Sequence, residues 1–267
     1  MFVLLLYAYH ETKQARGNLV HFLQHGALPV TSGRQVFVLN GPHSLAAAEF
    51  HDDDVIVERP NEGFDFGAWA VGLDRAPDHA YTHVVLMNAS VRGPFLPSYE
   101  PRPWWRVFGE QLDDEVGLVG TSLNCWASLS ETHLQSMFLM FAYERLEDVV
   151  RPAKLLASKR DHVDAVYTGE ISFSRAFLDA GYALKTQLVA FRSIGGVVTP
   201  AASRNEGEAG RALYAICRDL LVTNKHAGDV QYPGEYGHTD VHPLEVVFAK
   251  TGRGVAAAAL EAYGGWL

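Results

Sequence analysis

Short apolar runs alternate with amphipathic segments through the first part of this chain, and this rhythm restricts the fold more than any other feature. The apolar runs predict strands and the segments with apolar residues at helical spacing predict helices. The predicted strands are 2–8, 34–39, 55–58 and 82–87, and the predicted helices are 11–25 and 64–73. Strands that alternate with helices indicate a mainly parallel sheet with helices on both faces. We therefore expect an α/β fold of the Rossmann type.

The rhythm becomes less regular beyond residue 100. A strand is predicted at 115–121, helices at 170–180, 207–222 and 255–262, and a polar loop at 228–243. The apolar run at 134–141 fits either a strand or the start of a helix. We interpret the 267 residues as a single domain with two halves, 1–98 and 99–267, that share one continuous sheet.

Composition and charge argue against binding to nucleic acid and against insertion into a membrane. The chain has 22 Lys and Arg against 31 Asp and Glu, a net charge of −9. A surface this acidic argues against general nucleic-acid binding, although one locally positive pocket can still hold a nucleotide. No apolar run approaches the ~20 residues of a membrane span, so we expect no integral membrane segment.

The expected location follows from the N-terminus and the cysteines. The apolar run 2–7 is short and lacks a basic leader, which favours a buried strand over a signal peptide. Cys125 and Cys217 are widely separated and form neither a zinc pattern nor a disulfide framework. We therefore expect unpaired cysteines and a cytoplasmic protein, in contact with a membrane only at its periphery if at all.

Polar residues cluster directly after two of the predicted strands. Asn61, Asp65 and Gly67 follow the strand at 55–58, and Asn88 and Ser90 follow the strand at 82–87. In open α/β sheets ligands bind at the carboxyl ends of strands. Two short oxygen-bearing side chains there suit a divalent cation completed by a diphosphate. Helix caps and turns explain the same residues, and the pattern leaves both interpretations open.

Two further groups carry possible chemistry. Glu170 begins a predicted helix, where it is either a general base or a carboxylate stabilised by the helix dipole. His238, Asp240 and His242 form the densest histidine group, either a metal or phosphate contact or an ordinary surface loop. The chain lacks a dinucleotide fingerprint, a phosphate loop, a nucleophile elbow and a zinc-binding helix. Dehydrogenase, kinase, serine hydrolase and zinc protease functions are therefore disfavoured.

Five short motifs in series resemble one known family. They are Asn61-x-Gly-Phe-Asp-Phe-Gly-Ala-Trp69, Val85-Leu-Met-Asn-Ala-Ser-Val-Arg-Gly-Pro-Phe95, His133-Leu-Gln-Ser-Met-Phe138, Glu170 with Ser174, and Pro243-Leu-Glu-Val-Val-Phe-Ala-Lys-Thr-Gly-Arg253. The opening Tyr7-x-Tyr9-His10 fits the same pattern. Together they resemble the glycosyltransferase-like proteins of the rhamnan synthesis F type, within the GT-A class of nucleotide-sugar transferases.

The resemblance implies roles for individual residues. It implies a nucleoside-diphosphate sugar donor held by Tyr9, Asn61, Asp65, Gly67, Asn88, Ser90 and Arg92. It implies an acceptor, a saccharide or another hydroxyl compound, held by His133, Gln135 and Ser136. Glu170 is the first candidate for the general base and Glu245 is the second.

The resemblance also raises the question of a metal. Asn88 and Ser90 stand where GT-A enzymes carry an Asp-x-Asp metal motif, but the acids are missing and Ala89 lies between them. Mg²⁺ or Mn²⁺ can still bind through the diphosphate oxygens, with Asn88 and His238, Asp240 or His242 assisting. Alternatively, Arg92 or a lysine neutralises the leaving group without metal.

The sequence therefore predicts a glycosyltransferase that moves a sugar, such as rhamnose or another deoxyhexose, from a nucleoside diphosphate to a hydroxyl. A non-catalytic saccharide- or nucleotide-binding protein with a degenerate GT-A fold is the alternative, favoured by Ala89 and the missing acids. A metal-dependent hydrolase that uses residues 238–242 is a further candidate. Fold alone does not decide among them.

Overall fold

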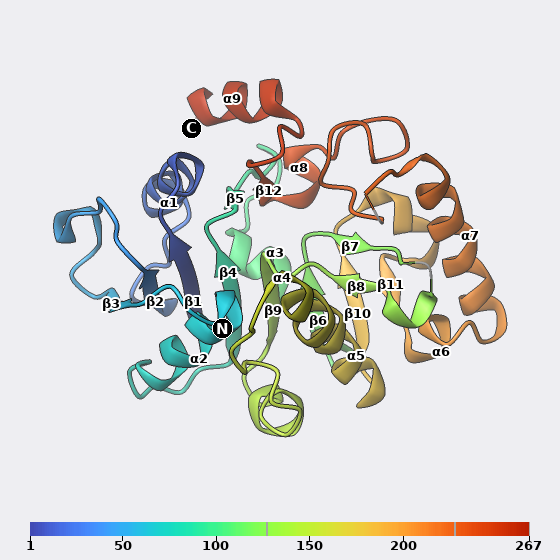
Figure 1. Cartoon of the computed structure of the whole chain (residues 1–267), viewed down its shortest axis with the longest axis horizontal. Helices are drawn as coiled ribbons and strands as arrows, with labels where there is room; N and C mark the ends of the chain where they lie inside the picture. The colour runs from blue at the N-terminus through green and yellow to red at the C-terminus, as the bar shows by residue number, and fades with distance from the viewer. Residues whose placement is uncertain (127, 227, 267) are drawn as a thin grey trace.

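The computed structural model describes residues 1–126, 128–226 and 228–266. Over these residues, eight strands form one sheet in the order β11-β10-β6-β9-β4-β1-β2-β3 (Figure 1). They are β1 (Val3–His10), β2 (Gly33–Asn40), β3 (Val55–Arg59), β4 (His83–Asn88), β6 (Val116–Gly120), β9 (Phe138–Ala142), β10 (Ala183–Thr186) and β11 (Val197–Val198). Only β9 and β11 run antiparallel to their neighbours. The sheet is mixed and mainly parallel, which confirms the predicted fold class.

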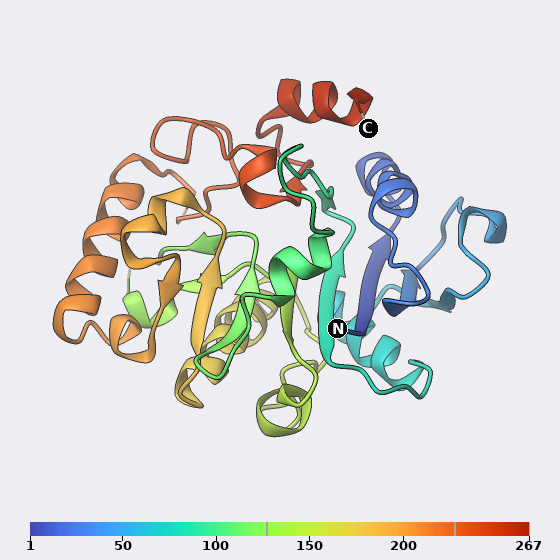
Figure 2. The same cartoon turned by 180° about the vertical axis from the view of Figure 1, so that it is seen from behind.

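Helices cover both faces of this sheet, as Figures 1 and 2 show from opposite sides. One face packs against α2 (Phe64–Asp74) and α5 (Ser172–Asp179), and the other packs against α1 (Lys13–His25) and α3 (Trp104–Gly109). The remaining helices are α4 (His162–Asp164), α6 (Pro200–Ser203), α7 (Gly207–Thr223), α8 (Pro243–Val246) and α9 (Ala257–Trp266). A π-helical segment, Ala165–Ile171, joins α4 to α5.

Strand β1 is buried on both faces, which explains its unbroken apolar sequence. Leu4 and Leu6 belong to the core on the α2 side, whereas Leu5, Tyr7 and Tyr9 belong to the core on the α1 side. Successive side chains of a strand point to opposite faces, so a strand covered twice needs apolar residues throughout. Tyr9 is therefore a core residue, with 1% of its surface exposed, and it lines neither of the pockets described below.

The second half of the chain forms shorter elements. The ambiguous run at 134–141 is extended, because it contributes to β8 (His133–Leu134) and β9. β8 pairs with β7 (Leu123–Asn124) in a small sheet of its own. The predicted helices near 170–180, 207–222 and 255–262 are present as α5, α7 and α9.

The C-terminal segment returns to the first half of the chain. β12 (Ala249–Lys250) pairs antiparallel with β5 (Val91–Arg92), which directly follows β4. The buried side chain of Asn18 strengthens this contact, since its Nδ2 donates to the carbonyl oxygen of Ala89 at 2.9 Å and to Oγ1 of Thr251 at 2.7 Å. As a result, Lys250 lies beside the carboxyl end of β4.

The cysteines are not free, contrary to expectation. Cys125 and Cys217 form a disulfide that joins the loop after β7 to α7 across a sequence separation of 92. Both are buried, and spacing along the chain does not reveal the packing that brings them together. No helix within the described ranges is long and apolar enough to span a bilayer.

Candidate functional site

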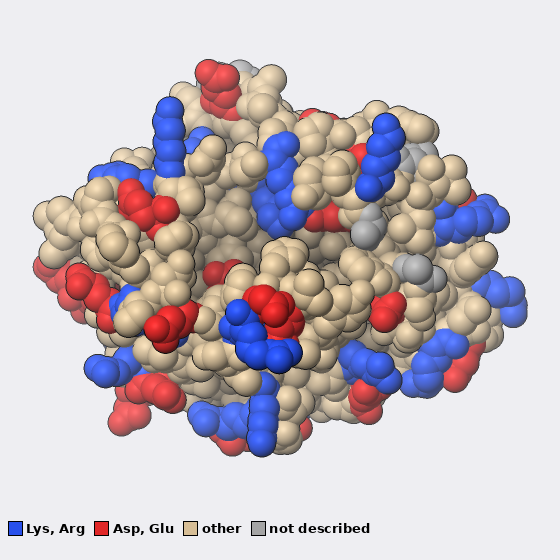
Figure 3. Space-filling view, viewed as in Figure 1, with Lys and Arg blue, Asp and Glu red and all other residues tan. Residues whose placement is uncertain are grey.

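Two adjoining pockets open at the carboxyl ends of β1 and β4, each with a volume of about 450 Å³. The β8 pocket lies over β7, β8 and the helical segment at 162–170, and the β1 pocket lies beside the end of β1 and the start of α1. Figure 3 shows the hollow near the centre of this face, with acidic and basic groups around it. The two pockets share a wall of five residues: Asp65, Asn88, Ser90, Lys250 and Arg253.

The acidic side of the shared wall is a hydrogen-bonded chain from α2 to the end of β4. Nδ2 of Asn88 donates to Oδ2 of Asp65 at 2.7 Å. Oδ1 of Asn88 accepts from the backbone N–H of Ser90 at 3.0 Å and from its hydroxyl at 2.6 Å. Removal from water raises the pKa of Asp65 to about 6, and the nearby charge of Glu170 acts in the same direction.

This arrangement does not fit a dedicated Mg²⁺ or Mn²⁺ site. Such ions need oxygen ligands. The amide N–H of Asn88 points toward Asp65, and its amide oxygen already accepts two hydrogen bonds from Ser90. The reverse orientation of the Asn88 amide would place its oxygen against the carboxylate of Asp65, so the hydrogen bonds select the orientation described. Over the described part of the chain, no group of three His, Cys, Asp or Glu side chains is arranged to hold a metal.

The basic side of the shared wall comes from the C-terminal segment. Arg253 forms an ion pair with Asp229, and its guanidinium lies 4.0 Å from the ring centre of Tyr232. The ammonium of Lys250 has no hydrogen bond or ion pair with any described residue. Removal from water lowers the pKa of Lys250, while the charges of Glu170 and Asp65 oppose that change.

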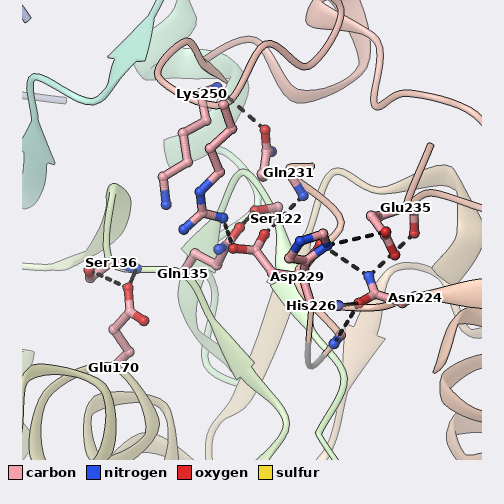
Figure 4. A network of polar contacts seen from close by, with 12 residues as sticks. Ser122, Gln135, Ser136, Glu170, Asn224, His226, Asp229, Gln231, Glu235 and Lys250 are labelled. Carbon is pink, nitrogen blue, oxygen red and sulfur yellow. Dashed lines mark hydrogen bonds and ion pairs between the residues drawn. The ribbon is translucent and has the colours of Figure 1, made fainter. Parts of the chain in front are cut away.

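A carboxylate and several hydrogen-bonding groups line the β8 pocket. Oε1 of Glu170 accepts from the backbone N–H of Ser136 at 2.9 Å and from its hydroxyl at 2.6 Å. Figure 4 shows this pair facing the space into which Lys250 extends. The hydroxyl of Ser122 donates to Oε1 of Gln135 at 2.6 Å, which fixes the Gln135 amide at the pocket wall.

His133 offers the pocket a hydrogen-bond acceptor. Its Nδ1 lies 2.7 Å from the carbonyl oxygen of Glu131, so Nδ1 carries the proton and Nε2 is the acceptor. Nε2 of His133 and Oδ1 of Asn124 are both buried without a partner among the described residues. Burial lowers the pKa of His133 and favours the neutral ring. Unpaired buried acceptors are expensive, so sugar hydroxyls are suitable partners for them.

The structure thus brings together Asp65, Asn88, Ser90, His133, Gln135, Ser136 and Glu170 from the predicted set. The others lie outside both pockets. Arg92 donates from Nε to Asn18 at 3.2 Å on the α1 side, and Asn61 is exposed in the loop before α2. Gly67 packs against Ser158, because a Cβ at position 67 would lie 2.8 Å from Oγ of Ser158. The lack of a side chain at position 67 allows this close packing.

The second candidate base and the histidine cluster are also structural. Oε1 of Glu245 accepts from the backbone N–H of Val189 and from the hydroxyl of Tyr236, each at 2.6 Å. Asp240 accepts from two backbone N–H groups, and His242 caps α8. His238, Asp240 and His242 line neither pocket that contains Asn88, so the proposed ligand set does not assemble.

Sequence reasoning missed several residues of the site: Lys250, Arg253, Asp229, Tyr232, Trp126, Asn124 and His10. Lys250 and Arg253 lie within the motif at 243–253, so the motif itself could have indicated them as site residues. Lys250 directly follows a short apolar run and Arg253 comes three residues later, just as Asn88 and Ser90 come at the end of the apolar run 84–87.

Comparisons with known proteins agree with this description. The family model described as rhamnan synthesis protein F matches residues 39–196. The chain therefore belongs to the rhamnan synthesis protein F family and is a glycosyltransferase. No curated protein matches.

Solved structures with a similar fold include two at low identity. One is the mannosyltransferase PcManGT from Pyrobaculum calidifontis, in complex with GDP-Man and Mn²⁺, at 15% identity and a TM-score of 0.43, covering 83% of this chain and 74% of that one. The other is TarS 1-349 of S. aureus, at 12% identity and a TM-score of 0.43, covering 82% of this chain and 70% of that one.

Proposed function

We propose that this member of the rhamnan synthesis protein F family transfers a sugar from a nucleoside diphosphate to a hydroxyl acceptor, with Glu170 as the general base. The observation that carries the proposal is the position of Glu170. Its carboxylate is fixed by Ser136 in the same pocket that Lys250 and Arg253 enter. A base and a pair of cations on facing sides are what this transfer requires.

The donor would span the two pockets. The nucleoside fits the β1 pocket, which is lined by His10, Thr12 and Gln14 at the end of β1. The diphosphate then lies at the shared wall, and the sugar points into the β8 pocket. This orientation is supported by the general rule that ligands of open α/β sheets bind at the carboxyl ends of strands.

The β8 pocket would hold the sugar and the acceptor. His133 and Asn124 provide buried acceptors for hydroxyl groups, and Gln135 provides an amide. Trp126 and Tyr232 add aromatic surface to the same pocket. We propose a saccharide acceptor because its hydroxyls and apolar ring faces match this mixture. From the family to which the chain belongs, we propose rhamnose or another deoxyhexose as the transferred sugar.

The reaction is a direct displacement. The acceptor oxygen forms a bond to the anomeric carbon while the bond from that carbon to the phosphate oxygen breaks. Glu170 takes the proton of the acceptor hydroxyl, and the electron pair of the broken bond leaves with the nucleoside diphosphate. Positive charge develops on the sugar ring and negative charge on the diphosphate, so fixed charges at the site stabilise the transition state.

Replacing Glu170 with glutamine tests the assignment. Glutamine keeps an acceptor for Ser136 but cannot take a proton, so we expect kcat to fall by about 100- to 10,000-fold with the donor KM little changed. The assay follows nucleoside diphosphate release and product mass with UDP-, dTDP- and GDP-linked sugars, including nucleoside-diphosphate rhamnose. Glu208→Gln, on the exposed first turn of α7, is the matched control.

Two results would overturn the proposal. Wild-type turnover in Glu170→Gln would remove Glu170 from the reaction. Binding of nucleotide sugars by the wild-type protein without any product from a panel of saccharide acceptors would instead support the non-catalytic binding function.

A further inference from the structure

We propose that this chain neutralises the diphosphate leaving group with Lys250 and Arg253 instead of a divalent metal ion. The inference rests on the proposed function, because it assigns the group that receives the negative charge in that reaction. It makes a direct prediction: donor binding and transfer should be independent of Mg²⁺ and Mn²⁺.

The first step is the chemistry at the end of β4. Asn88 presents an N–H group to Asp65, and its oxygen is occupied by the N–H and the hydroxyl of Ser90. The strand end therefore supplies no free carboxylate to a cation. Asp65 is the nearest acid, and it already faces the positive charge of Lys250.

The second step is the state of Lys250. Its side chain is partly buried in the wall that both pockets share, and its ammonium has no direct partner within the described ranges. A buried charge is costly unless it is paired, so this ammonium is a ready site for an anion. Glu170 and Asp65 keep the surrounding potential favourable to the cation until the anion binds.

The third step is the rigidity of the backbone that carries Lys250. β12 pairs with β5, and the N–H of Thr251 donates to the carbonyl oxygen of Ser90 at 3.1 Å. The N–H of Lys250 reaches Oε1 of Gln231 at 3.4 Å (Figure 4). A cation held in advance stabilises developing charge without a cost of reorganisation.

Arg253 supplies the second positive charge. One guanidinium nitrogen, Nη1, pairs with Asp229, and the ring of Tyr232 supports its flat face. A guanidinium has five N–H donors, so the remaining ones are available to phosphate oxygens. The two cations stand three residues apart on one segment and together offset part of the negative charge of a diphosphate, which is the part that a metal ion plays in other transferases.

Calorimetric titration of UDP, dTDP and GDP in excess EDTA and in excess Mn²⁺ tests the proposal, with transfer measured under both conditions. For the nucleotide that binds best, we expect affinities within about threefold of each other in the two buffers. Lys250→Met should weaken binding by about 10- to 100-fold, the loss typical of one charge-assisted hydrogen bond. Lys250→Arg should retain part of the affinity, and Lys154→Met, an exposed site, should leave it unchanged.

Methionine has about the length of lysine and removes a partly buried, unpaired charge, so the variant is expected to fold, and its melting temperature checks this. Binding that disappears in EDTA and returns with Mn²⁺ would overturn the inference, as would unchanged affinity in Lys250→Met. Transfer that occurs only with metal would sink this inference and leave the proposed function intact. Tight metal-free binding without transfer would overturn the proposed function and leave Lys250 and Arg253 as a pair that binds a diphosphate.

Discussion

Replacing Asp65 with asparagine should stabilise the protein at pH 8 and impair its function. Asp65 is the acid of the shared wall, and its Oδ2 accepts from Asn88 at 2.7 Å. An asparagine side chain can keep that acceptor while removing the charge. Because Asp65 is held away from water and near Glu170, its ionised form is unfavourable in the folded state.

The size and the sign of the effect follow from the pKa of Asp65, which rises from 3.8 to about 6 on folding. The folded state therefore holds this proton more tightly than the unfolded state does. The cost of ionisation is absent well below pH 3.8 and complete above pH 6. At about 1.4 kcal/mol per pKa unit the full cost is about 3 kcal/mol, of which about 2 kcal/mol develops between about pH 4 and pH 8. Both free energies are upper limits, because the Asp65 side chain is only partly buried and solvent screens its charge.

Urea unfolding of both proteins across this pH range measures the difference. We expect the free energy of unfolding of Asp65→Asn, relative to the wild type, to rise by up to about 2 kcal/mol from pH 4 to pH 8. The same variant should lose at least about tenfold in kcat/KM for the donor, because it removes a negative charge that helps to keep Lys250 protonated at the diphosphate site. A stability difference that stays flat across the pH range would show that Asp65 is solvated and would refute the reasoning.

Two further substitutions test the β8 pocket and the disulfide that holds α7. Ser136→Ala removes the hydroxyl that donates to Glu170 at 2.6 Å, and steady-state kinetics should show kcat about tenfold lower with the donor KM unchanged. Equal kcat would mean that the backbone N–H of Ser136 alone positions the base. Replacing Cys125 and Cys217 together with serine opens a loop across a sequence separation of 92 and should lower the free energy of unfolding by up to about 4 kcal/mol. A loss under about 1 kcal/mol in urea unfolding under oxidising conditions would show that packing alone holds α7.

Strands β1, β2 and β4 were predictable because each is an apolar run that the fold buries. The edge strand β3 is partly exposed, and only its apolar start, Val55-Ile56-Val57, predicted it. β1 and β2 match their predicted ranges to within two residues at each end. The two-residue strands β5, β7, β8, β11 and β12 were not predictable, since two residues show no periodicity. The helix predicted at 170–180 begins earlier, at α4, because a π-helical segment extends it toward the N-terminus.

The residues of the candidate site also divide into those with a local signal in the sequence and those without one. Asp65, Asn88 and Ser90 were found because they follow strands directly, which is a local signal. His133 was found through family resemblance alone, whereas the place of Glu170 at the start of a predicted helix had already made it a candidate base. Tyr9, by contrast, was assigned to the donor by resemblance, although strand alternation places it with Tyr7 and Leu5 in the core.

Arg92 and Lys250 show why the choice of cation required the structure. Either residue satisfies the chemical need for a positive charge near the end of β4, and Arg92 is much closer to Asn88 in sequence. Arg92 nevertheless turns to Asn18 on α1, whereas Lys250 arrives through the pairing of β12 with β5. Asn18 contacts residues next to both paired strands, Ala89 before β5 and Thr251 after β12. The cation site therefore exists only when the C-terminal segment docks, so the affinity for a nucleoside diphosphate also reports that docking.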